Sequence, residues 1–153
     1  MPGAVRLSYG EVAHHDRRGL PGNLGPDITM STTETTDAFT IEHHGELTIV
    51  TATPALESVG SAVEMLAARL IVEPLKNEIE PVILFDLSQV SYFGSVFLAV
   101  MIRCWKIVLS KSGTMGLSGV SDHARELLHF TSLDQAWPIY KDRREAIDAL
   151  LAE

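Results

Sequence analysis

The hydrophobic pattern of the chain is most distinctive over residues 83–101, which read ILFDLSQVSYFGSVFLAVM. Two apolar runs are separated there by a short polar step at Gly94 and Ser95. The first run, which opens with the apolar residues 82–85, is typical of a strand that is covered on both faces. The second, from Ser95 to Leu109, has the length of a helix. The pattern therefore predicts a buried strand that leads into a buried helix through one glycine and one hydroxyl.

Similar patterns predict the elements that precede this stretch. Alternating apolar positions on either side of Gly45 predict a hairpin over residues 39–53. A helix is predicted over residues 55–77, and we expect it to end or bend before Pro74, which cannot donate a backbone hydrogen bond. Its apolar stripe has helical spacing and consists of Leu56, Val59, Val63, Leu66 and Leu70.

Two further strands and two further helices are predicted after residue 112. A strand follows Gly113, and Ser121 is a suitable N-cap for a helix that runs to about Phe130. A short strand over residues 136–140 comes next. Asp142 and Glu145, spaced as in a capping box, open the last helix. Strands that alternate with helices in this way predict an α/β sheet layered with helices.

Residues 1–37 differ from the rest of the chain. They are rich in Gly, Pro, Ser and Thr and have no apolar period, so we predict a disordered extension, followed by a folded domain over residues 38–153. Met30 begins a stretch that would be a natural protein start. Our hypothesis is that residues 1–29 are an upstream extension that takes no part in the fold.

Length, charge and cysteine content exclude several classes of protein. A length of 153 residues suits one domain, and a net charge of −8 argues against a nucleic-acid partner. The single cysteine, Cys104, excludes an intrachain disulfide and fits a reducing compartment. The N-terminus lacks the apolar stretch of a secretory signal, and the most apolar run, residues 92–102, is too short to span a bilayer. We therefore expect a soluble cytoplasmic protein with no membrane partner.

The ordered set of motifs from Phe39 to Leu151 resembles the STAS domain, named for sulfate transporters and anti-sigma-factor antagonists. The resemblance rests on an aliphatic strand that ends in Asp-Leu-Ser, a Val-x-x-Phe step before the serine that opens a helix, and the sequence GLSGVS. An Arg-x-Leu-Leu helix, a Leu-Asp pair and PIY before the terminal helix complete it. It implies a single domain with a mixed β-sheet of about four to five strands covered by four helices.

The same resemblance implies a function. Stand-alone STAS proteins resemble binding modules without catalytic machinery or cofactor, which bind an anti-sigma factor that is also a serine kinase. The kinase phosphorylates the serine at the start of the second helix, and the complex dissociates. Ser95 would be that phosphoacceptor. The family motif is Asp-Ser-Ser-Gly-Leu, and here Gly94, Val96 and Phe97 replace its aspartate, second serine and glycine, while Ser95 and Leu98 match.

Two interpretations of Ser95 stay open at this point. A serine before an apolar helix is commonly an N-cap, with Gly94 supplying a backbone angle that other residues resist. A phosphate at the same place would be favoured by the helix dipole, and Asp86 could orient the loop before it. Val96 and Phe97 cannot both face the sheet. We expect one of them to contact a partner beside Gly94, or Phe97 to pack under the neighbouring loop.

Other candidate residues favour structural roles. Adjacent strand residues such as His43 and His44 point to opposite faces, so we expect no metal site there, and His14 and His15 fall in the extension. Cys104 lies among apolar helix residues without a visible activating base, which favours a core cysteine. We expect the charged residues 141–145 to form a solvated helix start.

The sequence therefore favours a non-enzymatic anti-sigma-factor antagonist that is controlled at Ser95 and can form a homodimer. One alternative is a STAS scaffold that is never phosphorylated and docks its partner through Val96 and Phe97. A second alternative is a small-ligand carrier or enzyme with a pocket near Asp86 and Ser95.

Overall fold

The computed structural model describes residues 6–7, 31–35, 38–56 and 62–152 of the chain. Its strands form one sheet in chain order and are β1 (Arg6–Leu7), β2 (Ser31–Thr35), β3 (Phe39–His44), β4 (Leu47–Ala52), β5 (Val82–Asp86), β6 (Thr114–Ser118) and β7 (Ile139–Tyr140). The helical segments are α4 (Ala62–Ala67), the π-helix η1 (Ala68–Val72), α5 (Glu73–Lys76), α6 (Ser95–Ser110), α7 (Asp122–Phe130), the 3₁₀ helix η2 (Leu133–Gln135) and α8 (Arg143–Leu150).

The sheet is mixed. Strands β1 to β4 pair antiparallel, and β4 to β7 pair parallel. The predicted hairpin is confirmed as β3 and β4, and Gly45 in its turn has a φ of 65°, a conformation that favours glycine. From β3 onward the order of strands and helices is the predicted one. The α/β fold class, with a mixed sheet whose core strands β3 to β7 are covered by four helices, is thereby confirmed.

The N-terminal part of the sheet was not expected from the sequence. Residues 31–35 fall in the segment predicted to be disordered, yet they form β2 and pair antiparallel with residues 40–44 of β3. This strand is rich in threonine, whose branched side chain suits a strand even where no apolar pattern exists. The sheet therefore includes residues on the N-terminal side of Ala38, where we had placed the start of the folded domain. Met30 and the rest of the proposed extension, apart from Arg6–Leu7, lie outside the described residues.

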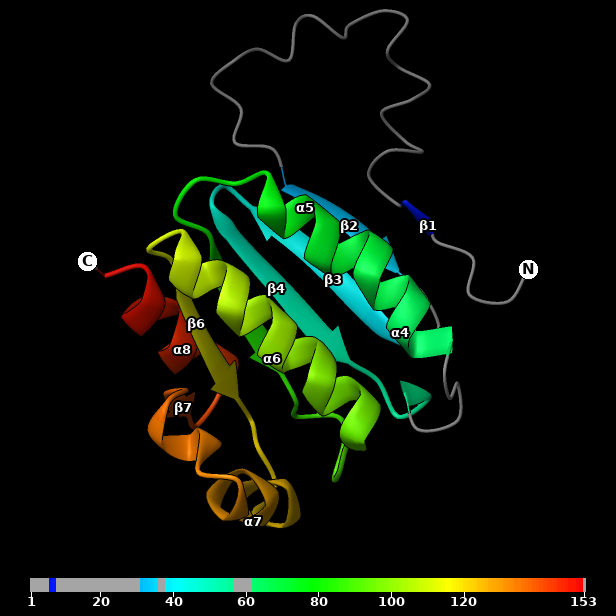
Figure 1. Cartoon of the computed structure of the whole chain (residues 1–153), viewed down its shortest axis with the longest axis vertical. Helices are drawn as coiled ribbons and strands as arrows, with labels where there is room; N and C mark the ends of the chain where they lie inside the picture. Colours follow the sequence, from blue (N-terminus) through cyan, green and yellow to red (C-terminus); the bar gives the residue numbers. More distant parts are fainter. Residues whose placement is uncertain (1–5, 8–30, 36–37, 57–61, 153) are drawn as a thin grey trace, which may run out of the picture.

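The two faces of the sheet are covered by different helices. Helices α4, α5 and α6 lie over one face in Figure 1, and α8 lies behind the other. Side chains of β5 alternate accordingly: Ile83 and Phe85 pack in the larger core under α6, whereas Leu84 packs with Ala146 of α8. All of β5 is buried, as its apolar sequence predicted. This buried strand is followed directly by the loop that leads to the start of α6.

The helical segment that contains Pro74 continues through the proline, so of the two outcomes we expected, an end or a bend, the end is excluded. A π-helical turn, residues 68–72, precedes the proline, and the Glu73 N–H donates to the Ala68 carbonyl five residues earlier. In this turn the hydrogen bonds span five residues instead of four, just before Pro74, which has no N–H to donate. The chain then stays helical to Lys76. Val59 of the predicted apolar stripe lies outside the described residues.

Candidate functional site

The connection between β5 and α6 begins with a turn that Asp86 stabilises. Its Oδ1 accepts a hydrogen bond of 3.0 Å from the Ser88 N–H, which is the turn-capping role common for a strand-end aspartate. The carboxylate is buried, and its other oxygen accepts from Arg143 Nε at 3.1 Å. Asp86 therefore fixes the first turn of the connection and links it to α8.

Ser95 is the first residue of α6 and is not its N-cap. Gly94 occupies the cap position, and its carbonyl accepts from the Leu98 N–H at 3.1 Å. No side chain caps this end of the helix. The N-cap interpretation of Ser95 is therefore wrong by one position, and the Ser95 side chain is exposed at the first turn.

Gly94 does not adopt a conformation that requires glycine. Its φ of −87° and ψ of −175° are extended angles open to any residue, which corrects our expectation of an unusual backbone angle. A Cβ placed on Gly94 would meet nothing within 4 Å. The aspartate of the family motif would therefore fit here, and its absence leaves the first turn of α6 open to solvent.

Val96 and Phe97 face in different directions. Phe97 is 2% exposed and makes edge-to-face contacts with Phe85, at 5.9 Å between ring centroids, and with Phe93, at 6.1 Å. It cannot protrude as an interface anchor, so the alternative in which it packs inward holds. Val96 is 38% exposed and is the residue of the pair that a partner can reach.

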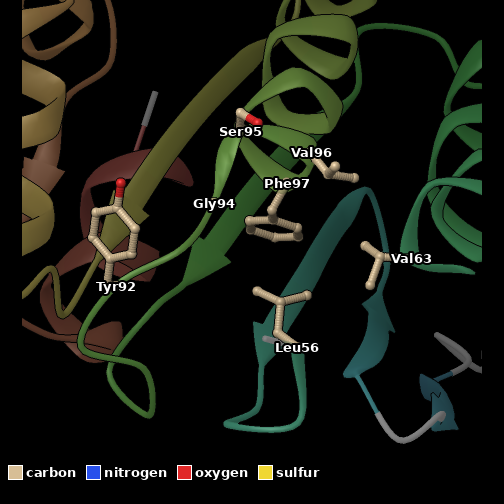
Figure 2. A pocket seen from close by; sticks show the side chains of 7 residues that line it. All are labelled: Leu56, Val63, Tyr92, Gly94, Ser95, Val96 and Phe97. Atoms are coloured by element: carbon tan, nitrogen blue, oxygen red, sulfur yellow. The ribbon is translucent and has the colours of Figure 1, made fainter. Parts of the chain in front are cut away.

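A pocket of about 380 Å³ lies beside Ser95. Figure 2 shows the Phe97 ring pointing into it, toward Leu56, with Tyr92 on the other side of the loop. Leu56 follows β4 and Val63 belongs to α4, so three segments meet at this pocket. Its lining residues are Leu56, Val63, Tyr92, Gly94, Ser95, Val96 and Phe97. The lining is apolar except for two hydroxyl groups, and it suits an apolar group placed next to Ser95.

The connection is also joined to α7. Ser121 caps α7 by accepting from the Ala124 N–H at 3.1 Å, as predicted, and its hydroxyl donates to the Ser91 carbonyl at 2.6 Å. The Tyr92 ring lies 4.7 Å from the His123 ring. The sequence analysis predicted neither the Ser121–Ser91 hydrogen bond nor the Tyr92–His123 contact. Local sequence indicates that a serine caps a helix, but it does not indicate which distant residues that serine or its neighbours will meet.

Close backbone packing supports the same junction. Gly119 has a φ of +68°, and a Cβ there would lie 2.6 Å from the Ser88 Cβ. Only glycine lets the segment between β6 and α7 approach the turn after β5 so closely. The loop that carries Ser91 and Tyr92 therefore rests against the start of α7 at several points.

Arg143 is a structural residue that the sequence analysis placed wrongly. It lies in the charged stretch expected to form a solvated helix start, but its guanidinium is only partly exposed. It donates to Asp86 Oδ2 at 3.1 Å, to Glu42 Oε2 at 3.3 Å and to Thr51 Oγ1 at 2.7 Å. Arg143 thus ties α8 to β3, β4 and β5, and its local sequence gave no sign of these distant partners.

A model of the STAS domain matches residues 29–146, which is most of the chain. The chain belongs to the STAS domain family. No curated protein sequence matches it. Among solved structures, it is similar to an anti-sigma-factor antagonist (STAS) domain protein from Planctomyces limnophilus, with 26% identity over 74% of this chain and 97% of that one and a TM-score of 0.65.

Two more distant structures share the fold of this STAS domain. An anti-sigma factor antagonist from Mycobacterium paratuberculosis is 22% identical over 74% of this chain and 92% of its own, with a TM-score of 0.58. A putative anti-sigma factor antagonist from Thermotoga maritima is 19% identical over 73% of this chain and 93% of its own, also with a TM-score of 0.58. The match to the family model confirms the resemblance of the sequence to the STAS domain, and these structures confirm its fold.

The burial and hydrogen bonds of the remaining candidate residues of the STAS domain fit structural roles. Cys104 is buried, and burial raises the pKa of its thiol to about 12, which makes it a poor nucleophile. His43 Nδ1 lies 3.4 Å from Thr48 Oγ1, and His44 pairs with Glu42 at 3.1 Å. Within the described residues no group of three metal-ligating side chains occurs, and no helix is long and apolar enough to cross a membrane. His14 and His15 lie outside the described residues.

Proposed function

We propose that this STAS domain is an anti-sigma-factor antagonist whose partner docks over the start of α6 and is released when Ser95 is phosphorylated. The observation that carries the proposal is the exposed Ser95 hydroxyl in the first turn of a long helix, beside an apolar pocket. The partner would be an anti-sigma factor with serine kinase activity, and the exchange would take place in the cytoplasm of a bacterium to regulate transcription. The relatives described as anti-sigma-factor antagonists support this role.

The start of α6 is suited to a phosphate. The first N–H groups of the helix have no intrahelical acceptor, and no side chain caps them. A phosphate on Ser95 would lie near these donors and near the positive end of the helix dipole, so the fold would tolerate it. Gly94 adds no negative charge of its own. Phosphorylation would therefore leave the folded domain intact.

A docked partner would not tolerate the same phosphate. The modification adds about 1.5 to 2 negative charges with their hydration. The neighbouring Val96 and the pocket floor are apolar, so a partner that covers them would have to bury these charges without compensation. Phosphorylation would thus act on the free energy of binding and leave the free energy of unfolding nearly unchanged.

The substitution Ser95→Asp tests this separation. We expect binding to the purified kinase-type anti-sigma factor of the same organism to weaken at least about tenfold, because a charge enters an apolar contact. The melting temperature should stay the same or rise slightly, since an acidic residue suits the first turn. Isothermal titration calorimetry and thermal denaturation measure the two quantities. Unchanged binding would place Ser95 outside the interface.

Phosphorylation itself is tested with ATP and the same kinase. Mass spectrometry of the intact protein and of its peptides should find one phosphate, on Ser95, and none in the variant Ser95→Ala. If Ser95 stays unmodified while Val96→Asp still abolishes binding, the domain acts instead as a scaffold that docks partners without phosphorylation.

The pocket beside Ser95 favours a second candidate function, the binding of a small apolar ligand. Its volume of about 380 Å³ falls within the range of ligand sites, and its lining carries the hydroxyl groups of Tyr92 and Ser95. A fragment screen observed by NMR would test it. Shifts confined to Leu56, Val63 and Val96 would support a ligand site, and the absence of any saturable shift would exclude one.

A further inference from the structure

We infer that the partner's contact area extends from Ser95 across Tyr92 onto α7, where the exposed ring of Phe130 is a second anchor point. This inference rests on the proposed function, because it concerns the same partner. It adds a surface that the resemblance to the STAS family did not indicate, formed by one side of α7. We call it the α7 surface, and its residues are Tyr92, His123, Glu126, Leu127 and Phe130.

The α7 surface is continuous with the pocket beside Ser95. It encloses a hollow of about 250 Å³, and Tyr92 lines both this hollow and the pocket. Tyr92 is 37% exposed, and its ring is stacked on Phe93 at 6.2 Å and lies 4.7 Å from the His123 ring. A protein that covers Ser95 therefore meets the α7 surface next.

The loop that carries Tyr92 and helix α7 are also fixed relative to each other. The Ser121 hydroxyl joins the start of α7 to the Ser91 carbonyl at 2.6 Å, one residue before Tyr92. Gly119 packs against Ser88 at the base of the same loop. Because both contacts hold the loop against the segment that leads into α7, the loop and α7 present a preformed surface, and a partner loses little free energy in ordering it.

The size of a stable interface requires such an extension. Specific protein interfaces bury about 800 Å² on each partner and involve roughly 20 to 30 residues a side. An interface of that size centred on the pocket beside Ser95 must extend onto neighbouring surfaces, and the α7 surface adjoins the pocket at Tyr92. Phe130 is 87% exposed and is the largest apolar side chain on the α7 surface, and aromatic residues are enriched among those that dominate binding energy.

The charges of this surface indicate the chemistry of the occupant. Glu126 is exposed at the edge of the hollow and makes no ion pair within the described part of the chain. The whole chain has a net charge of −8. The segment of the partner that covers α7 should therefore present an apolar side chain to Phe130 and Leu127 and a lysine or arginine to Glu126.

The test compares two exposed apolar residues. Ile79 is 87% exposed, as Phe130 is, but it precedes β5 and so lies at the opposite end of that strand from Ser95. Binding of the purified kinase-type anti-sigma factor is measured by calorimetry for Phe130→Ala, Ile79→Ala and Ser95→Asp. We expect Phe130→Ala to weaken binding about tenfold or more and Ile79→Ala to leave it unchanged. Melting temperatures check that each variant is folded.

The outcomes separate this inference from the proposed function. If Ser95→Asp weakens binding and Phe130→Ala does not, the extension onto α7 is wrong and the proposed function stands. If neither variant weakens binding, the proposed function fails as well. If sedimentation velocity shows a dimer that Phe130→Ala dissociates while binding of the anti-sigma factor is unaffected, a second copy of this chain covers α7, and the inference is overturned.

Discussion

Val96 and Phe97 are neighbours in sequence with opposite environments, and the helical phase of α6 explains why. Phe97 is in line with the buried residues Val100, Cys104 and Val108, which follow at intervals of three, four and four. Val96 lies about 100° around the helix from Phe97, at the edge of this buried stripe, and is exposed. The sequence analysis recognised that both could not face inward. The spacing along the whole helix would have identified Phe97 as the buried one.

Gly94 is the residue whose replacement should increase the stability of the folded domain. Its extended backbone and open surroundings admit a side chain, and α6 has no side-chain cap. Gly94→Asp should therefore raise the free energy of unfolding by about 0.5–1 kcal/mol, because the carboxylate accepts from the first N–H groups and suits the helix dipole. Urea denaturation followed by circular dichroism measures the gain.

Gly94→Ala is the matched control for this substitution. It adds the same Cβ without a hydrogen-bond acceptor, and alanine is a poor N-cap, so stability should not rise. A gain for Gly94→Ala equal to that for Gly94→Asp would mean that loss of glycine flexibility in the unfolded chain, and not capping, is responsible.

At the level of elements, the sequence predicted the fold well wherever local pattern decides the structure. The strand β5, the helix α6 and the caps at Ser121 and Asp142 follow from short-range periodicity and capping rules. The strand β2 was missed because a strand without an apolar pattern is defined by its backbone pairing with its neighbours, here with β3. The cap position of α6 was predicted to within one residue, but the contacts of the preceding loop with α7 were not predicted.

The junction between that loop and α7 should weaken when Ser121 loses its hydroxyl. In Ser121→Ala, α7 loses its N-cap and Ser91 loses a hydrogen bond, at a cost of about 1–2 kcal/mol. Amide hydrogen exchange in residues 88–94 should become faster. The variant Asp142→Ala is the control, since Asp142 caps α8 by accepting from the Glu145 N–H and, within the described part of the chain, makes no hydrogen bond to this loop. Equal acceleration in both variants would mean that global unfolding, and not the junction, controls exchange.

At the scale of the whole molecule, Arg143 connects parts of the chain that are far apart in sequence. Its partners Asp86, Thr51 and Glu42 precede it by 57, 92 and 101 residues. No local pattern can predict such pairs, because they depend on how β3, β4, β5 and α8 are arranged in three dimensions. The consequence is that the far side of the sheet supports the strand end from which the Ser95 loop starts.

The substitution Arg143→Leu tests how much this connection contributes to stability. It leaves the buried Asp86 carboxylate with the Ser88 N–H as its hydrogen-bond donor within the described residues, and loss of a hydrogen bond to a charged group costs about 1.5–3 kcal/mol. We therefore expect the free energy of unfolding to fall by about that amount. The adjacent Arg144, which is exposed, provides the control Arg144→Leu and should change stability by less than about 0.5 kcal/mol.

The effect of Arg143→Leu should also reach the binding surface. Because Asp86 Oδ1 fixes the turn at Ser88, loss of the guanidinium should let this turn move, and affinity for the anti-sigma factor should fall although Arg143 lies on α8, outside the proposed contact area. Adding Asp86→Asn to Arg143→Leu removes the uncompensated charge and should restore part of the stability. Two single variants whose losses simply add in the double variant would show that Arg143 and Asp86 are not coupled, since coupled partners deviate from additivity.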